Sequence, residues 1–410
     1  SVRSARAQWQ LHGASRPGLY RLLTVTVGVL ALIGLVMVFS ASSVASLSVY
    51  GSAWVVFARQ LAWMALAIAA FSVASRLDYH RWQRWSVPLL CISIVLLILV
   101  LIPGIGIYVS GSRRWIGYGA LRFQPSEIAK IALLMFLADL VTRRADEVHR
   151  WRRVLFPALG MLAVVGLLVM KEPDMDSTIV LALIVGAVLL VGGIRMRDLL
   201  GLGGIGLGLA AILAVSADYR RARVFSFLHP FAQATGDGYQ LAQSLIALGS
   251  GGLTGLGLGA SRQKWLFLPN AHTDFIFAII GEELGILGAF AVLVLFAALA
   301  VWGTMIAMRA PDRFGMLVAA GITTWIVGQA LINIGAVIGV LPVSGIPLPF
   351  VSFGGSSLLF TMLAAGILAN VARQGGRERV VALEPEPTGS PRRLRSVNHP
   401  VFAGARGAKR

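Results

Sequence analysis

The sequence predicts an all-α polytopic membrane protein with about ten transmembrane helices and both termini in the cytoplasm. Three observations predict this fold class. Hydrophobic residues make up 57% of the 410 residues and charged residues only 13%, with a mean hydropathy of +0.78, which does not suit a water-soluble globule. Apolar stretches of membrane-spanning length recur along the chain, and arginines gather in alternate segments between them.

The apolar stretches give the number of spans. A helix needs roughly 20 apolar residues to cross the hydrocarbon core. We expect ten such spans, centred near Ala31, Leu66, Val95, Leu134, Val164, Val185, Leu209, Val292, Thr324 and Leu363. The first is of full span length and follows several arginines, so we expect no cleavable signal peptide.

The arginines predict the orientation, because basic residues in short loops stay on the cytoplasmic side. The basic segments are the N-terminal arm 1–21 and residues 76–84, 143–153, 195–197, 309–313 and 373–410. They alternate with an even number of spans in a membrane domain of residues 22–372. The expected outer segments are 44–53, 104–124, 171–176, 218–274 and 342–356. The tail 373–410 lacks apolar periodicity and is predicted to be disordered.

The remaining composition excludes several classes of function. The net charge of +18 is spread over these basic segments, so attraction to anionic lipid explains it better than nucleic-acid binding. The glycine pattern of residues 201–206 lies in a predicted span, which favours close helix packing over a dinucleotide site. The chain has a single cysteine, Cys91, so no internal disulfide can form.

The outer segment 218–274 is long for a connection, and such length usually indicates a function. Within it, Leu241, Leu245 and Leu248 recur at helical spacing and predict a short helix. This helix either lies on the bilayer surface or packs against the bundle. It ends at the glycine-rich residues 249–252.

Asp274 is the most informative residue of this segment, because its carboxylate stands directly before a long apolar run. A carboxylate at a membrane boundary is retained because it has a partner there or because its altered proton affinity is used. His272 lies next to it and is a candidate proton relay. No cluster of histidines and cysteines accompanies His272, which argues against zinc.

Further polar groups precede predicted spans that share the outer boundary with Asp274. Glu127 and Lys130 are three residues apart near the start of the fourth span, so they share one helix face and can pair. This pair either serves a site or merely neutralises two buried charges. Asp174 precedes another helix start, where it is either an N-cap or a site residue.

Residues 341–357 are too rich in proline and glycine for one helix and too apolar for an ordinary loop. We expect a re-entrant or surface-lying segment, because irregular backbone at membrane depth must be satisfied by protein or by a watery cavity. Together with the outer carboxylates and Lys130, this segment is predicted to surround one outward-facing cavity.

Six collinear motifs resemble the SEDS family of cell-wall polymerases. The terminal arm and tail make the chain most similar to the division-specific FtsW branch, and less similar to the elongation branch RodA. The motifs are Arg114-Trp115-Ile116, residues 123–130, Lys171-Glu172-Pro173-Asp174, residues 236–240, residues 271–275 with 281–285, and residues 345–349 with 354–357.

The resemblance implies a peptidoglycan glycosyltransferase that polymerises lipid II into β-1,4 glycan strands on the outer face during cell division and releases undecaprenyl pyrophosphate. Asp274 occupies the position that the family treats as catalytic. Converting an α-linked sugar pyrophosphate to a β-linkage inverts the anomeric carbon, which one displacement with one general base achieves. We expect Asp274 to be this base.

In this hypothesis, the negative charge that develops on the leaving pyrophosphate is stabilised by Lys130 and by Arg113 or Arg114. A divalent cation, Mg²⁺ or Mn²⁺, would stabilise the same charge. Glu127 would hold Lys130. The residues expected to line the cavity are Asp174, Trp115 and Ser356, and the candidate metal ligands are Asp174 and Asp274. No organic cofactor is expected.

The resemblance also implies partners and a location. The partners are a class B penicillin-binding protein acting as transpeptidase, other division proteins, lipid II and undecaprenyl-linked glycan, and membrane lipids, with no nucleic acid. The location is the bacterial plasma (inner) membrane at the division septum. The alternatives are a lipid II flippase or transporter, whose polar groups should sit at mid-membrane, and a division scaffold.

The chain departs from the family pattern in two places. Phe353 stands where tyrosine is usual, and Asp176-Ser177 stand where glycine and threonine are usual. Asp176 adds an acidic group beside Asp174, where we expect it to raise proton affinity or to help hold a cation.

Overall fold

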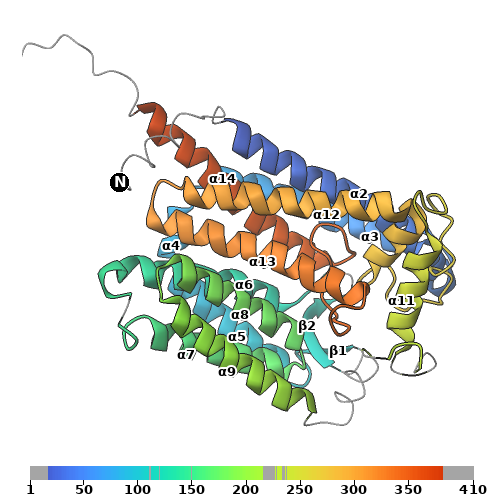
Figure 1. Ribbon diagram of the computed structural model, residues 1–410, viewed down its shortest axis with the longest axis horizontal. Helices are drawn as coiled ribbons and strands as arrows, with labels where there is room; N and C mark the ends of the chain where they lie inside the picture. The colour runs from blue at the N-terminus through green and yellow to red at the C-terminus, as the bar shows by residue number, and fades with distance from the viewer. Residues whose placement is uncertain are drawn as a thin grey trace, which may run out of the picture.

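The computed structural model describes residues 17–109, 112–119, 121–148, 150–215, 227, 229–232, 236 and 238–381. Figure 1 shows a bundle whose long helices run along the long axis of the molecule. The helices of the described chain are α2 (Pro17–Tyr50), α3 (Trp54–Arg76), α4 (His80–Arg84), α5 (Ser86–Leu101), α6 (Pro125–Arg143), α7 (Leu155–Lys171), α8 (Met175–Val191), α9 (Met196–Val215), α11 (Tyr239–Ser250), α12 (Ile276–Met308), α13 (Arg313–Val337) and α14 (Gly355–Val381), with a 3₁₀ turn at Ala145–Glu147.

The predicted spans coincide with these helices, since each of the ten expected centres lies inside one of them. Within the described residues, α2, α3, α12, α13 and α14 are long and apolar enough to cross a membrane, and α5, α7 and α8 are shorter apolar helices. The prediction of a mostly helical, multi-span membrane protein is therefore confirmed. The number of membrane crossings and their orientation stay predictions.

The expectation of an all-α protein is wrong in the segment after α5. Residues of this segment form a three-stranded antiparallel sheet of β1 (Ile107–Val109), β2 (Ser112–Tyr118) and β3 (Leu121–Phe123), in the order β1-β2-β3. Aromatic and β-branched residues recur in these strands, and such residues pack well on a pleated surface. Ile116 pairs with Phe123 across β2 and β3.

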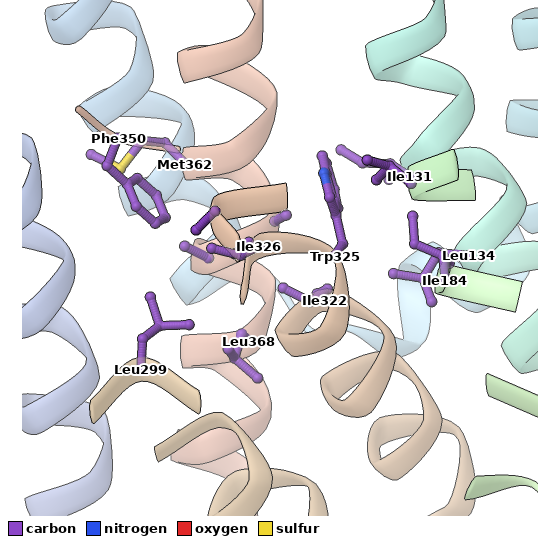
Figure 2. Packing of buried hydrophobic residues seen from close by; sticks show 14 of the residues in the cluster. Ile131, Leu134, Ile184, Leu299, Ile322, Trp325, Ile326, Phe350, Met362 and Leu368 are labelled. Atoms are coloured by element: carbon purple, nitrogen blue, oxygen red, sulfur yellow. The ribbon is translucent and has the colours of Figure 1, made fainter. Parts of the chain in front are cut away.

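The core of the bundle is built around α13, which packs against α6, α8, α12 and α14. A Cβ atom at Gly321 of α13 would lie 2.2 Å from Cδ1 of Leu134 on α6, so this glycine permits the close approach of the two helices. Figure 2 shows buried α13 side chains with α6 and α8 residues on one side and α12 and α14 residues on the other, among them Ile322, Trp325, Ile326, Ile131, Leu134, Ile184, Leu299, Met362 and Leu368.

The two ends of the bundle differ in their side chains. One end, which we call the cavity end, carries the C-terminus of α2, the sheet and the N-termini of α3, α6, α8, α12 and α14. The opposite end, the basic end, carries Arg76, Arg143 and Arg313 at the helix termini there. This separation agrees with the predicted alternation of basic and outer segments.

Helix α11 decides between the two alternatives for residues 241–248. It packs against α12 and α13, and Leu241, Ala242, Ser244 and Ala247 are buried. The helix that packs against the bundle is therefore confirmed. Most of the expected outer loop before it, residues 218–237, lies outside the described residues.

The first and last helices extend beyond the predicted membrane domain of residues 22–372. Helix α2 begins at Pro17, inside the expected arm 1–21, and α14 continues to Val381, beyond the expected boundary at 372. The first of the added residues are held by side-chain hydrogen bonds, since Arg373 donates to the carbonyl of Ser75 over 2.9 Å and Gln374 donates to Asp78 over 3.0 Å. Residues 1–16 and 382–410 lie outside the described residues.

Helix α9 contradicts the packing predicted for the glycines of residues 201–206. A Cβ atom at Gly201, Gly203, Gly204 or Gly206 would meet no heavy atom within 4 Å. The glycines of the described part of α9 therefore do not serve a close helix contact in this structure.

Candidate functional site

A cavity of about 720 Å³ lies at the cavity end of the bundle. Its walls come from α2, α3, α6, α8, the sheet, the turn before α12, the segment 345–354 and α14. Four basic and four acidic side chains line it, namely Arg59, Arg114, Arg122, Lys130, Glu127, Asp174, Asp176 and Asp274. Such a mixture of charges suits a polar, charged substrate rather than an apolar one.

The turn before α12 positions Asp274 on the wall of this cavity. Asn270 has a φ of 56°, a left-handed conformation that asparagine adopts more readily than most residues. Its carbonyl then accepts hydrogen bonds from the amides of Thr273 and Asp274, both over 3.1 Å, which tightens the turn. The local sequence therefore fixes where the carboxylate enters the cavity.

Burial raises the pKa of the Asp274 carboxyl to about 7, and the charge of Asp176 adds to this rise. The guanidinium of Arg114 and a hydrogen bond from Thr273 act in the opposite direction. A carboxyl with a pKa near neutrality can accept a proton efficiently at physiological pH. Asp274 therefore has the proton affinity that a general base needs.

The charge of Asp176 therefore acts on Asp274 as well as lying two residues from Asp174. One oxygen of Asp176 also accepts a hydrogen bond of 2.9 Å from the amide of Gly345. Asp176 therefore links the start of α8 to the segment 345–354 and adds negative charge that acts on Asp274.

Glu127 and Lys130 form the predicted ion pair on α6, with 2.8 Å between the Lys130 ammonium and a Glu127 oxygen. Both side chains are almost completely buried. The ammonium also donates to Gln329 over 3.4 Å and lies 5.1 Å from the ring centre of Trp325. Lys130 nevertheless borders the cavity. A buried cation beside a cavity attracts an anionic group more strongly than an exposed one.

Asp174 combines the two roles that the sequence left open. Its carboxylate accepts from the amide of Ser177 over 3.1 Å, which makes it the N-cap of α8. The same side chain lines the cavity. It accepts from the side-chain amide of Gln124 over 2.8 Å and from the Ser126 hydroxyl over 3.4 Å. The N-cap therefore also joins α8 to the start of α6.

Glu172 is a buried carboxyl behind the cavity wall, and neither of its oxygens has a hydrogen-bond partner among the described residues. Burial raises its pKa to about 9, the charge of Asp174 adds to the rise, and Arg114 opposes it. Glu172 is therefore neutral at physiological pH.

Arg114 and Trp115 of β2 line the cavity as expected. The guanidinium of Arg114 donates to the carbonyls of Glu172, over 2.9 Å, and Pro173. Arg113 is not among the lining residues, and its guanidinium lies 6.0 Å from the ring centre of Tyr108 on β1. Of the two arginines that the sequence offered, the structure therefore places Arg114 at the cavity.

His272 and Ser356 are also not among the lining residues. Burial lowers the pKa of the His272 imidazole, so the ring is neutral, and its backbone carbonyl accepts from the Phe353 amide over 2.9 Å. The Ser356 hydroxyl is buried and accepts from the backbone amide of Gln124 over 3.3 Å. Both residues therefore bond to cavity-lining residues, His272 to Phe353 and Ser356 to Gln124.

Sequence reasoning missed several functional candidates. Tyr50, Arg59 and Trp63 line the cavity from α2 and α3. The signal was present in the sequence, because an arginine just inside an apolar span is rare and usually functional. Gln329 and Asn333 of α13 were missed as well, although they are buried amides in a predicted span.

The candidate cation site has carboxylates but no preformed cluster. Among the described residues, no group of three or more histidine, cysteine, aspartate or glutamate side chains is placed to hold a metal ion. Asp174 and Asp274 both line the cavity. A divalent cation would therefore need oxygen ligands from a bound substrate as well.

Comparison with known sequences gives one family across most of the chain. A family model named FTSW_RODA_SPOVE and described as "Cell cycle protein" matches residues 20–376. Stage V sporulation protein E of Bacillus subtilis is 43% identical over 86% of this chain and 96% of its own length. The probable peptidoglycan glycosyltransferase FtsW of Geobacter metallireducens is 40% identical over 83% of this chain and 90% of its own.

Solved structures share the fold. A chain of a peptidoglycan synthase complex, described in terms of polymerization and crosslinking, has a TM-score of 0.71 at 28% identity and covers 88% of this chain and 98% of that one. The crystal structure of the rod shape determining protein RodA of Thermus thermophilus has a TM-score of 0.64 at 28% identity, over 86% of this chain and 96% of that one.

Proposed function

The chain belongs to the FTSW_RODA_SPOVE family of cell cycle proteins, and from this premise we propose that it is a peptidoglycan glycosyltransferase that polymerises lipid II into β-1,4 glycan strands. Relatives named as probable glycosyltransferases of this kind support the activity. The observation that carries the proposal is the cavity, which gathers Asp274, Lys130 and Arg114 around one space.

The reaction is one inverting displacement with Asp274 as the general base. The 4-hydroxyl oxygen of one sugar attacks the anomeric carbon of the other, and the bond from that carbon to the pyrophosphate oxygen breaks. The hydroxyl proton passes to the carboxylate of Asp274, and undecaprenyl pyrophosphate leaves. The pKa of about 7 lets a large fraction of Asp274 be ionised at neutral pH.

The leaving pyrophosphate gains negative charge as the bond breaks, and cations stabilise that charge. Lys130 is the cation that the protein buries most deeply at the cavity, and Glu127, Gln329 and Trp325 hold it in place. Arg114 lines the same cavity from β2. Mg²⁺ or Mn²⁺ would add charge at the same step, with Asp174 or Asp274 as ligands.

The proposed setting places the cavity end on the outer side of a bacterial plasma membrane, at the division septum. The arginines of the basic end support this orientation through the inside rule. A class B penicillin-binding protein is the proposed partner, supported by the likeness to a chain from a synthase complex that coordinates polymerization and crosslinking.

The deciding experiment measures polymerisation of lipid II by the purified full-length protein bound to its transpeptidase partner. Asp274→Asn should form no glycan strands, whereas Asp78→Asn, which changes an exposed carboxylate at the basic end, should polymerise like the wild type. Wild-type rates in Asp274→Asn would overturn the mechanism. Movement of lipid II across the bilayer without strands would favour a transporter instead.

A further inference from the structure

Residues 252–267, between α11 and the turn that carries Asp274, expose an unusual number of large apolar side chains. We call this stretch the apolar segment. Large apolar side chains gathered on an exposed stretch of chain are typical of contact with a protein or a membrane. The exposed fractions are 70% for Leu253, 40% for Leu256, 61% for Leu258, 63% for Trp265, 62% for Leu266 and 54% for Phe267.

The apolar segment is bound to a break in α12. Gly285 has a φ of 68°, which interrupts the helix and frees the carbonyls before it. The carbonyls of Glu282 and Glu283 accept hydrogen bonds from the amides of Leu256, over 2.9 Å, and Gly257, over 3.0 Å. A Cβ atom at Gly255 would lie 2.1 Å from the Glu283 carbonyl oxygen, so only glycine permits this approach.

Bonds in the opposite direction complete the attachment. The amide of Ile286 donates to the carbonyl of Gly252 over 3.0 Å, and the amide of Leu287 donates to that of Leu253 over 3.3 Å. The irregular backbone of the apolar segment and the broken turn of α12 therefore satisfy each other at four positions. Irregular backbone at membrane depth must be satisfied by protein or by a watery cavity, and here the protein satisfies it.

Two buried carboxylates hold the apolar segment from inside. Glu282 accepts from the amide of Arg262 over 2.9 Å and from the hydroxyl of Ser261. Glu283 accepts from the Ser40 hydroxyl of α2 over 2.7 Å and lies 3.5 Å from the Lys264 ammonium. Ser261 and Lys264 of the segment are thus buried against α12, while its large apolar side chains are exposed.

The apolar surface continues onto the membrane-spanning part of α12. Ile286, Leu287 and Phe290 are 58%, 63% and 61% exposed, and they belong to a helix long and apolar enough to cross a membrane. Because Ile286 and Leu287 bond directly to the apolar segment, the two surfaces adjoin. In Figure 1 the yellow coil after α11 lies at the end of α12 that is nearest to α11.

We propose that the apolar segment 252–267 is inserted into the lipid leaflet at the cavity end, with its exposed leucines, Trp265 and Phe267 against acyl chains. The exposed Arg262 lies in the same segment and suits the phosphate of a lipid headgroup. Tryptophan is typical of the membrane interface. The inserted segment would hold the turn that begins after Phe267, and with it Asp274, at a fixed depth beside the bilayer.

The test is site-directed spin labelling, for which the single natural cysteine of the chain, Cys91, is first removed. In the full-length Cys91→Ala protein, one nitroxide label is placed at Leu258→Cys or Phe267→Cys. Matched controls are Phe290→Cys, on the membrane-spanning part of α12, and Tyr118→Cys, 94% exposed on the sheet. The labelled proteins are reconstituted into vesicles of phosphatidylethanolamine and phosphatidylglycerol. Collision rates are measured with oxygen, which concentrates in lipid, and with a water-soluble nickel chelate.

We expect labels at 258 and 267 to behave like the label at 290, with oxygen collisions exceeding chelate collisions. Two results would overturn the proposal: behaviour like the label at 118, which means water, or low collision rates with both reagents, which means cover by protein. Because no substrate is present, the outcome is independent of the proposed glycosyltransferase activity. The two label positions guard against one variant failing to fold.

Discussion

The side-chain amide of Asn333 donates a hydrogen bond of 2.8 Å to the backbone carbonyl of Asp274. The same amide nitrogen donates to the carbonyl of Ile346 over 2.7 Å. One buried residue of α13 therefore ties the turn that carries the proposed base to the segment 345–354 of the cavity wall. One turn earlier on the helix, Gln329 accepts from Lys130 and donates to the carbonyl of Pro347 over 2.9 Å.

Asn333→Ala should slow polymerisation more than it weakens substrate binding. Loss of both bonds frees the turn before α12, and misplacement of a catalytic group by about 1 Å can cost about 100-fold in rate. We expect kcat to fall roughly 10- to 100-fold with KM little changed. Steady-state kinetics of lipid II polymerisation measures both constants.

Ser244→Ala is the matched control, because its buried hydroxyl also bonds to α13, donating to the carbonyl of Val337 over 2.8 Å, and neither residue lines the cavity. Each variant leaves buried carbonyls unpaired and should lose about 1 to 3 kcal/mol of stability per lost bond. If both variants lost kcat in proportion to stability, Asn333 would be structural only.

The rate of polymerisation should rise with pH through about 7, because Asp274 must be ionised to accept a proton. Asp176→Asn removes a negative charge that raises the pKa of Asp274, so the rising limb should move to lower pH. The replacing amide can still accept from Gly345 through its oxygen. Arg114, which opposes Asp176, is unchanged in this variant, and so is Asp174.

The pH profile of kcat for wild type and Asp176→Asn checks this prediction. Asp78→Asn, at the basic end, should leave the profile where it is. An unchanged profile in Asp176→Asn would mean that the two carboxylates do not influence each other across the cavity.

Breaking the Glu127–Lys130 pair should destabilise the protein. Removal of one member of a buried pair leaves an uncompensated charge and costs about 3 to 5 kcal/mol. Glu127→Gln and Lys130→Met should therefore each lower Tm, and the double variant should recover much of the loss. Thermal unfolding in detergent measures the three values and their coupling.

Polymerisation rates of the same three variants distinguish a catalytic role of the pair from a purely stabilising one. The stable double variant should remain inactive, because it lacks the cation assigned to the leaving pyrophosphate. If it polymerised lipid II normally, the pair would serve only to neutralise buried charge.

Glu172→Gln should make the folded protein more stable at alkaline pH. The pKa of Glu172 is raised to about 9 in the folded state from an ordinary value of 4.5, so its contribution is fully present below 4.5 and is lost as pH rises toward 9. Glutamine cannot ionise, so the gap in Tm between variant and wild type should widen from pH 5 to pH 9. An equal gap at both pH values would mean that Glu172 has a partner in solution.

Removal of divalent cations with a chelator should slow polymerisation, and added Mg²⁺ or Mn²⁺ should restore it. Because the described residues hold no preformed metal cluster, the protein without substrate should bind Mg²⁺ only weakly. Calorimetric titration of Mg²⁺ with and without a pyrophosphate-containing lipid checks this. Tight binding to the protein alone would contradict the prediction.

Periodicity and composition predicted the helices well, because a membrane span requires a long apolar run that few other structures need. They also indicated that Asp274, Lys130 and Asp174 are site residues, because a charged group at a span boundary is usually retained for a partner or a function. Periodicity could not predict the short sheet after α5, where no strand is longer than seven residues. Nor could it find Asn333 or choose Arg114 over Arg113, because both depend on contacts between distant segments.

The cavity wall has a consequence for biosynthesis. Its last strip, Gly345 to Ser357, is contributed by the part of the chain that a ribosome makes after α13. A nascent protein that already carries Asp274, Lys130 and Arg114 still lacks this strip and the partners it offers to Asp176, Gln329 and Asn333. A chain that ends with α13 therefore lacks these bonds, and we expect it to reach the membrane without becoming active.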